Sequence, residues 1–167
     1  MKKSISCSIL AVALSASAGL AQTPAGQTAK PQSATPQTPA AGAPATPGLK
    51  KKAAPNTVVY IQSPKDGETV SSPFTVRFGL KGMGIAPAGI DQPNTGHHHL
   101  LIDVEKVPDF NGALPATDNI KHFGAGQTET ELTLPPGRHT LQLVFADYLH
   151  IPHDKPVVSE KVTITVK

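Results

Sequence analysis

Short apolar runs that alternate with polar residues, separated by turns rich in Gly and Pro, occupy the chain from residue 57 to residue 167. A period of two is typical of β-strands with one buried face, and no convincing helical period is found in this stretch. We expect strands at residues 57–62, 74–80, 98–104, 128–134, 139–147 and 157–166. Six strands at this spacing predict an all-β domain, an immunoglobulin-like antiparallel β-sandwich. The long Pro/Gly-rich stretch 105–127 holds an additional edge strand or a loop, and the pattern does not decide between them.

The first 21 residues have the anatomy of a secretory signal peptide, with two lysines followed by an apolar run of small residues that ends near Ala21. We expect cleavage after Ala21 and a periplasmic or secreted protein. Cys7, the only cysteine, lies inside this segment. The mature chain would therefore have no disulfide and no cysteine-ligated metal. No later segment approaches the length needed to cross a bilayer, so no transmembrane segment is expected in the mature chain.

Residues 22–56 form a second segment, with 7 Pro and 9 Ala but no acidic or aromatic residue. Such a composition buries too little apolar surface to offset the entropy of ordering, and it predicts a disordered Pro/Ala/Thr-rich linker. The sandwich domain is then expected at residues 57–167. Because nine basic and twelve acidic residues lie in that domain, its net charge is −3 and nucleic acid is not an expected partner.

The seven histidines all lie in the expected domain. His97 and His99 are two residues apart on a strand, so they share one face at a separation of about 6.6 Å. If strands 98–104 and 139–147 pair antiparallel as strands C and F of the sandwich, the start of the first and the end of the second meet at one end. Imidazole suits Cu(II) and Zn(II). The expected ligands of such an ion are His97, His99, His150 and His153.

Further residues have supporting or open roles. Asp147 would orient one ligand by accepting its second N–H, and Tyr148 lies at the same end. His98 has the parity of the core-facing residues of its strand, and the position of His122 is open. Asp103 lies about 13 Å along the strand from His99, too far to share an ion directly, so we expect it to have a structural role or to support a ligand. His139 stands where such folds often carry a corner tyrosine, and we expect it to make a structural hydrogen bond.

Four motifs resemble one known family. They are GHHHLLID at 96–103, HFGAGQTE at 122–129, PGRHTLQL at 136–143, and Asp147 followed by HIPH at 150–153. In this order, over about residues 61–166, they resemble the bacterial "domain of unknown function 4399" family. The resemblance implies a secreted or periplasmic β-sandwich domain and implies no activity.

An enzyme is not expected, because the sequence contains no nucleophile elbow, no His-Glu-x-x-His motif and no phosphate-binding Gly loop. The residues favour an extracytoplasmic module that binds a transition-metal ion, Cu(II) or Zn(II), through histidines. The alternative is a metal-free envelope module in which the histidine network is structural and the partner is a protein. The sequence does not identify the metal, the partner or the oligomeric state.

Overall fold

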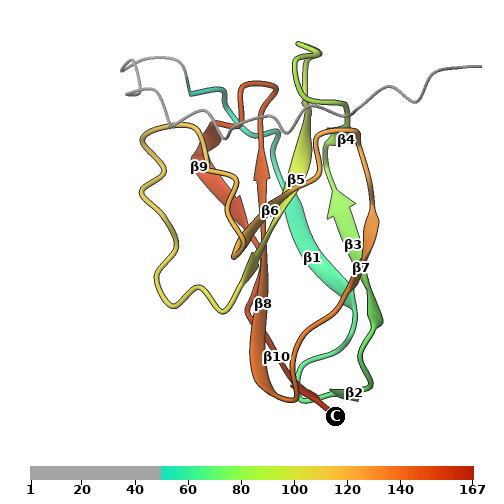
Figure 1. Cartoon of the computed structure of the whole chain (residues 1–167). Coiled ribbons are helices and arrows are strands. Elements are labelled where there is room, and N and C mark those ends of the chain that lie inside the picture. Colours follow the sequence, from blue (N-terminus) through green and yellow to red (C-terminus); the bar gives the residue numbers. More distant parts are fainter. Residues whose placement is uncertain (1–49) are drawn as a thin grey trace, which may run out of the picture. The chain divides into compact units, whose positions relative to one another are not determined.

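The computed structural model describes residues 50–167, and these residues form two β-sheets (Figure 1). The first sheet has the order β1-β3-β7, with strands β1 (Val58–Ser63), β3 (Phe74–Lys81) and β7 (Glu129–Leu132). The second has the order β2-β10-β8-β5-β4, with strands β2 (Thr69–Val70), β10 (Val162–Val166), β8 (Gly137–Ala146), β5 (Thr95–Ile102) and β4 (Gly84–Ile85). Two more strands lie off this path: β6 (Ile120–His122) pairs with β5, and β9 (Pro152–Val158) pairs with β8.

This strand order confirms the predicted immunoglobulin-like sandwich. The first sheet corresponds to strands A, B and E of that fold, and the β10-β8-β5 run of the second corresponds to strands G, F and C. The pairing of β5 with β8 is antiparallel, with His97 opposite Ala146 and Ile102 opposite Leu141. The start of β5 and the end of β8 therefore lie at one end of the sandwich, as the sequence predicts.

The main core lies between the two sheets. Val76 and Phe78 of β3 pack with Leu100 of β5 and Leu143 of β8, and all four side chains are buried. The alternation of apolar and polar residues in the sequence places these side chains on the inner faces. Burial of this apolar surface supplies the main favourable contribution to folding.

A second apolar cluster covers the outer face of the β5–β8 sheet. Leu101 of β5 and Val144 of β8 pack there against Leu114 and Ile120. The loop 103–119 supplies Leu114 and runs outside the second sheet, on the side away from β1, β3 and β7 (Figure 1). Residues 105–127, which the sequence pattern leaves undefined, thus contain a covering loop and the short strand β6.

Some strand boundaries differ from the predicted ones. β5 begins at Thr95, three residues before the predicted start, so the histidine run lies within the strand. The predicted strand 157–166 is divided into β9 and β10. Ser159 separates them, because its N–H donates to the Leu143 carbonyl and its Oγ accepts from the Leu143 N–H. The two-residue strands β2 and β4 are too short for a periodicity to reveal.

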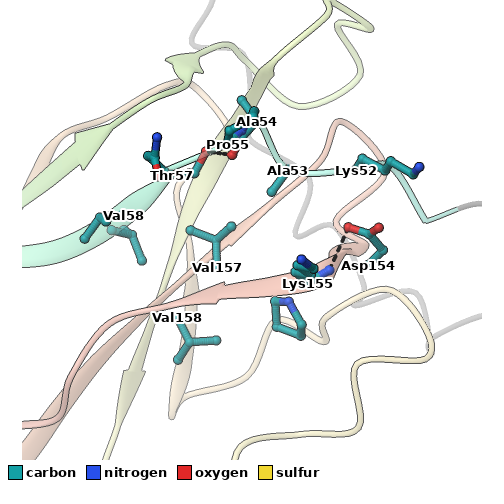
Figure 2. Close-up of a pocket in the computed structure, with 13 residues that line it drawn as sticks. Lys52, Ala53, Ala54, Pro55, Thr57, Val58, Asp154, Lys155, Val157 and Val158 are labelled. Carbon is teal, nitrogen blue, oxygen red and sulfur yellow. Dashed lines mark hydrogen bonds between the residues drawn. The ribbon is translucent and has the colours of Figure 1, made fainter.

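Residues 50–56, which the sequence assigns to the linker, contact the domain. The Lys51 ammonium pairs with Asp91 and lies 4.5 Å from the centroid of the Tyr148 ring, and the Lys51 carbonyl accepts the Asp154 N–H. Residues 52–59 and 154–158 line a pocket that contains none of the histidines (Figure 2). The predicted signal peptide and linker residues 22–49 lie outside the described residues. Within residues 50–167, no helix has the length and apolar character needed to cross a membrane.

Candidate metal centre

Strand β5 places two imidazoles on the outer face of the second sheet. His97 and His99 have the parity of Leu101, which belongs to the outer cluster, whereas His98 has the parity of core residue Leu100. His97 is 0% exposed and His99 is 1% exposed. Opposite His97 the partner strand carries Ala146, whose small side chain leaves room for the ring. The centroids of the His97 and His99 rings are 4.9 Å apart.

Strand β6 adds a third imidazole. It pairs antiparallel with β5 so that His122 lies directly opposite His99, and the two ring centroids are 5.2 Å apart. Gly124 makes the position of the His122 ring possible. A β-carbon at residue 124 would lie only 2.2 Å from Cε1 and 2.4 Å from Nε2 of His122.

The turn between β8 and β9 supplies the fourth imidazole, His150. Asp147 builds this turn, because its Oδ1 accepts the backbone N–H groups of Leu149 and Ile151, each at 2.9 Å. The His150 N–H donates to the Asp147 carbonyl at 2.9 Å. His150 has a left-handed backbone with φ of 68°. A residue other than glycine keeps this conformation only where the surrounding contacts impose it.

Three of these histidines offer nitrogen atoms that converge. One ring nitrogen from each of His97, His122 and His150 lies within 4.8 Å of the others, so this group could hold a metal ion. Nε2 of His122 and Nε2 of His150 are 3.1 Å apart. His99 lies beside the group, with its ring centroid 5.9 Å from that of His150.

The four rings differ in their exposure to solvent. His97 and His99 form the buried side of the cluster, whereas His122 is exposed and His150 is partly buried. The loop 103–119 contacts the turn that carries His150, because the Leu114 N–H donates to the His150 carbonyl at 2.9 Å. The cluster therefore has a buried floor on β5, formed by His97 and His99, and a more exposed side at His122 and His150.

Burial keeps the imidazoles of the floor neutral. Burial, followed by the charges of His150 and His122, lowers the pKa of His97 to about 3. The pKa of His99 is held well below its ordinary value by burial and by the neighbouring histidines. Burial and the charge of His150 also lower the pKa of His122. Neutral imidazole is the form that binds metal.

Several ring nitrogens of the buried histidines have no hydrogen-bond partner. In the cluster these are both ring nitrogens of His97 and Nδ1 of His99. A buried polar group without a partner costs about 1–3 kcal/mol, and native structures contain few of them. Both ring nitrogens of His98 and Nδ1 of His153, which lie outside the cluster, are also without a partner.

The structure does not bring His153, an expected ligand, into the converging group. The His153 ring stacks at 3° to the ring of Phe145, a residue of the main core, with centroids 6.2 Å apart. Burial lowers the pKa of His153. Asp147, expected to accept an imidazole N–H, instead accepts the two backbone N–H groups of its turn, and its Oδ2 has no partner. Tyr148 contacts Lys51 through its ring.

The other expected residues lie away from the group. His98 points into the main core between Phe78 and Phe145, with ring centroids 5.2 Å from each, and burial lowers its pKa to about 4. At the opposite end of β8, Nδ1 of His139 bonds to Asp103 at 2.7 Å and Nε2 bonds to the Pro135 carbonyl at 2.9 Å. The hydrogen bond to Asp103 raises the pKa of His139.

His122 is the member of the group whose position sequence reasoning left open. Its strand has three residues and follows a long irregular loop, so neither periodicity nor spacing places it. The one signal that could identify it is its residue type. A histidine elsewhere in the sequence is a candidate ligand if the fold brings it next to the run His97–His99.

Comparison with known proteins gives a family and a structural likeness. No curated protein matches the sequence. Among solved structures, the fibronectin(III)-like modules of Clostridium thermocellum CbhA align with a TM-score of 0.33 and 12% identity, covering 65% of this chain and 93% of that one. The model of the family described as "Domain of unknown function (DUF4399)" matches residues 76–167, more than half of the chain. The protein therefore belongs to the DUF4399 family.

Proposed function

We propose that this protein is an extracytoplasmic binding module that takes up a divalent transition-metal ion, Cu(II) or Zn(II). His97, His122 and His150 bind the ion, and the His99 ring borders the site from the buried side. The expected signal peptide at residues 1–21 supports the assignment to the periplasm or the exterior. Storage, delivery and sensing of a metal are the roles that such a module serves, and none of them requires catalysis.

The observation that carries the proposal is the burial of the His97 ring without hydrogen-bond partners. Its ring is 0% exposed, neither ring nitrogen has a hydrogen-bond partner, and it lies in van der Waals range of three other imidazoles. A bound ion would satisfy one buried nitrogen and so offset a cost of about 1–3 kcal/mol. Because burial lowers the pKa of His97 to about 3, no proton has to be displaced at neutral pH.

The spacing of the nitrogens supports the same proposal. Imidazole nitrogens bound at about 2.0–2.1 Å to a tetrahedral ion lie about 3.3–3.4 Å from each other. The His122–His150 pair at 3.1 Å is already near that separation. Across the whole group the largest separation is 4.8 Å, so closure onto an ion needs movements of about 1–2 Å. The exposed His122 ring can make such a movement.

The donor set favours borderline metal ions. The described residues hold no cysteine, and imidazole is the only donor type in the converging group. Such nitrogen sites suit Zn(II) and Cu(II), whereas Mg²⁺ and Ca²⁺ prefer oxygen ligands. The choice between Zn(II) and Cu(II) then depends on the geometry that the three rings of the converging group adopt around the ion.

The test is a titration of the purified protein, prepared without a histidine tag, with Zn(II) and Cu(II). One ion per chain is expected, with raised thermal stability that grows with metal concentration; at 100 times Kd the gain is about 2.7 kcal/mol. His122→Ala and His150→Asn should weaken binding at least tenfold. Asparagine is chosen because it tolerates the left-handed backbone of residue 150. His139→Gln, at the far end of β8, is the matched control and should bind as the wild type does.

A metal-free histidine network is the second candidate function. The 3.1 Å between Nε2 of His122 and Nε2 of His150 is also a hydrogen-bond distance, which favours a network that fastens the 147–151 turn to β6. In that case His122→Ala and His150→Asn destabilise the protein, and wild type and variants alike bind no stoichiometric ion. The cluster would then support an interaction surface for an envelope partner.

A further inference from the structure

The metal centre has a charge that its own ligands do not balance. The three imidazoles of the converging group are neutral donors, so a bound divalent ion would keep its full charge of +2. Among the described residues, the converging group contains no acidic side chain. A divalent charge next to buried, neutral groups is costly unless an anion compensates it.

No carboxylate belongs to the converging group of the described residues. Asp147 directs Oδ1 to the backbone amides of its own turn, and its buried Oδ2 has no partner. Asp103 is paired with His139 at the other end of β8, and Asp91 pairs with Lys51. The atoms that would bind the ion are therefore imidazole nitrogens alone, and no carboxylate oxygen among them balances its charge.

The cluster leaves one direction free for an external ligand. His97 and His99 close the buried side, while His122 is exposed and His150 is partly buried. Zinc sites with three protein ligands hold a water or a substrate at the remaining position, and Cu(II) in tetragonal geometry takes additional axial ligands. Solvent reaches the ion from the side on which His122 and His150 lie.

We propose that the metal-loaded site binds a small anion directly on the ion, at the solvent-facing position beside His122 and His150. This inference rests on the proposed metal function. The ligand class is a small inorganic anion or a carboxylate with an oxygen or nitrogen donor. Its negative charge compensates the dication. The module then recognises a metal and an anion together.

The test uses the protein loaded with Cu(II), with bound copper measured after gel filtration, and azide as the probe. Azide should produce a saturable charge-transfer absorption and a changed EPR spectrum, with one azide per copper, while the copper stays on the protein. If no copper is retained, the proposed metal function fails. If one copper is retained and azide leaves both spectra unchanged, the metal function stands and the anion position is wrong.

Two pairs of charge variants locate the anion. Leu149 is exposed and precedes His150, so Leu149→Glu should weaken azide binding about threefold or more and Leu149→Lys should strengthen it. Val58→Glu and Val58→Lys make the same charge changes at an exposed residue of β1, on the other sheet, and should leave azide binding within about twofold of wild type. Equal effects at both positions, or none at residue 149, would contradict the assigned position.

Discussion

Replacement of Gly124 by alanine perturbs the metal centre without removing a histidine. The new β-carbon would lie 2.2 Å from Cε1 and 2.4 Å from Nε2 of His122, whereas carbon atoms pack at about 3.5–4.0 Å. The ring must therefore move by about 1 Å or more. Gly124 has no left-handed φ, so alanine fits its backbone. The two shortest contacts are to the His122 ring, and a third, to Ala88 Cβ at 3.2 Å, is less severe.

The effect on stability should be small and the effect on metal binding large. His122 is exposed and can swing toward solvent, at a cost of less than about 1 kcal/mol in the free energy of unfolding. A displaced Nε2 no longer lies 3.1 Å from Nε2 of His150. Disturbance of the groups that orient a ligand costs about 10–100-fold in metal affinity, which corresponds to about 1.4–2.7 kcal/mol.

The assay compares metal Kd, measured by competition with a chromophoric chelator, with the free energy of unfolding of the metal-free protein in urea. Gly84→Ala is the control, because its β-carbon meets Thr95 Cγ2 at 3.3 Å and not a histidine. It should keep the wild-type Kd. A folded Gly124→Ala protein with wild-type affinity would refute the role of His122. An equal loss of affinity in both variants would show that the effect is not local.

Three further predictions concern contacts beside the cluster and at the opposite end of β8. Asp147→Ala should lower stability by about 1–3 kcal/mol and weaken metal binding, because two amides of the His150 turn lose their acceptor; Asp147→Asn, which keeps an acceptor oxygen, should recover most of both. His153→Ala should lower the urea midpoint, because it removes a buried ring that stacks on Phe145, and it should leave the metal Kd unchanged. Loss of metal binding in this variant would place His153 among the ligands. The pKa of His139 is raised in the folded protein by Asp103, so its stabilising contribution is present below about pH 6.5 and is lost as the pH rises through the folded pKa. In metal-free protein the stability of His139→Gln relative to wild type should therefore improve from pH 5.5 to pH 8.5, and a constant difference would contradict the pairing.

The sequence predicts most of the sandwich because alternation and turn residues are local signals. The inner faces of β3, β5 and β8 follow directly from their apolar parity. The antiparallel pairing of β5 with β8 follows from the order of strands in such sandwiches, and it brings the His97 end of β5 to the turn that carries His150. The boundaries of β5 and the division of the last predicted strand depend on long-range hydrogen bonds, such as those of Ser159 to Leu143, that no local pattern contains.

The candidate site was harder to predict, for two physical reasons. His122 reaches the cluster only because the loop 103–119 covers the outer face and returns the chain to β5, a tertiary effect of Leu114 and Ile120 burying apolar surface there. His153 lies close to His150 in sequence, but the register shift between Phe145 and Ala146 accompanies the start of β9. Its ring lies against Phe145 instead of the other imidazoles.

A crystal structure of the metal-loaded protein, with anomalous diffraction data collected at the absorption edge of the bound metal, would locate the ion. We expect one strong anomalous peak between His97, His122 and His150, with ligand nitrogens at about 2.0–2.1 Å. His99 should border the peak from the buried side. A protein that crystallises without metal from metal-containing solution, or a peak at His98, His139 or His153 with none at the cluster, would contradict the proposed centre.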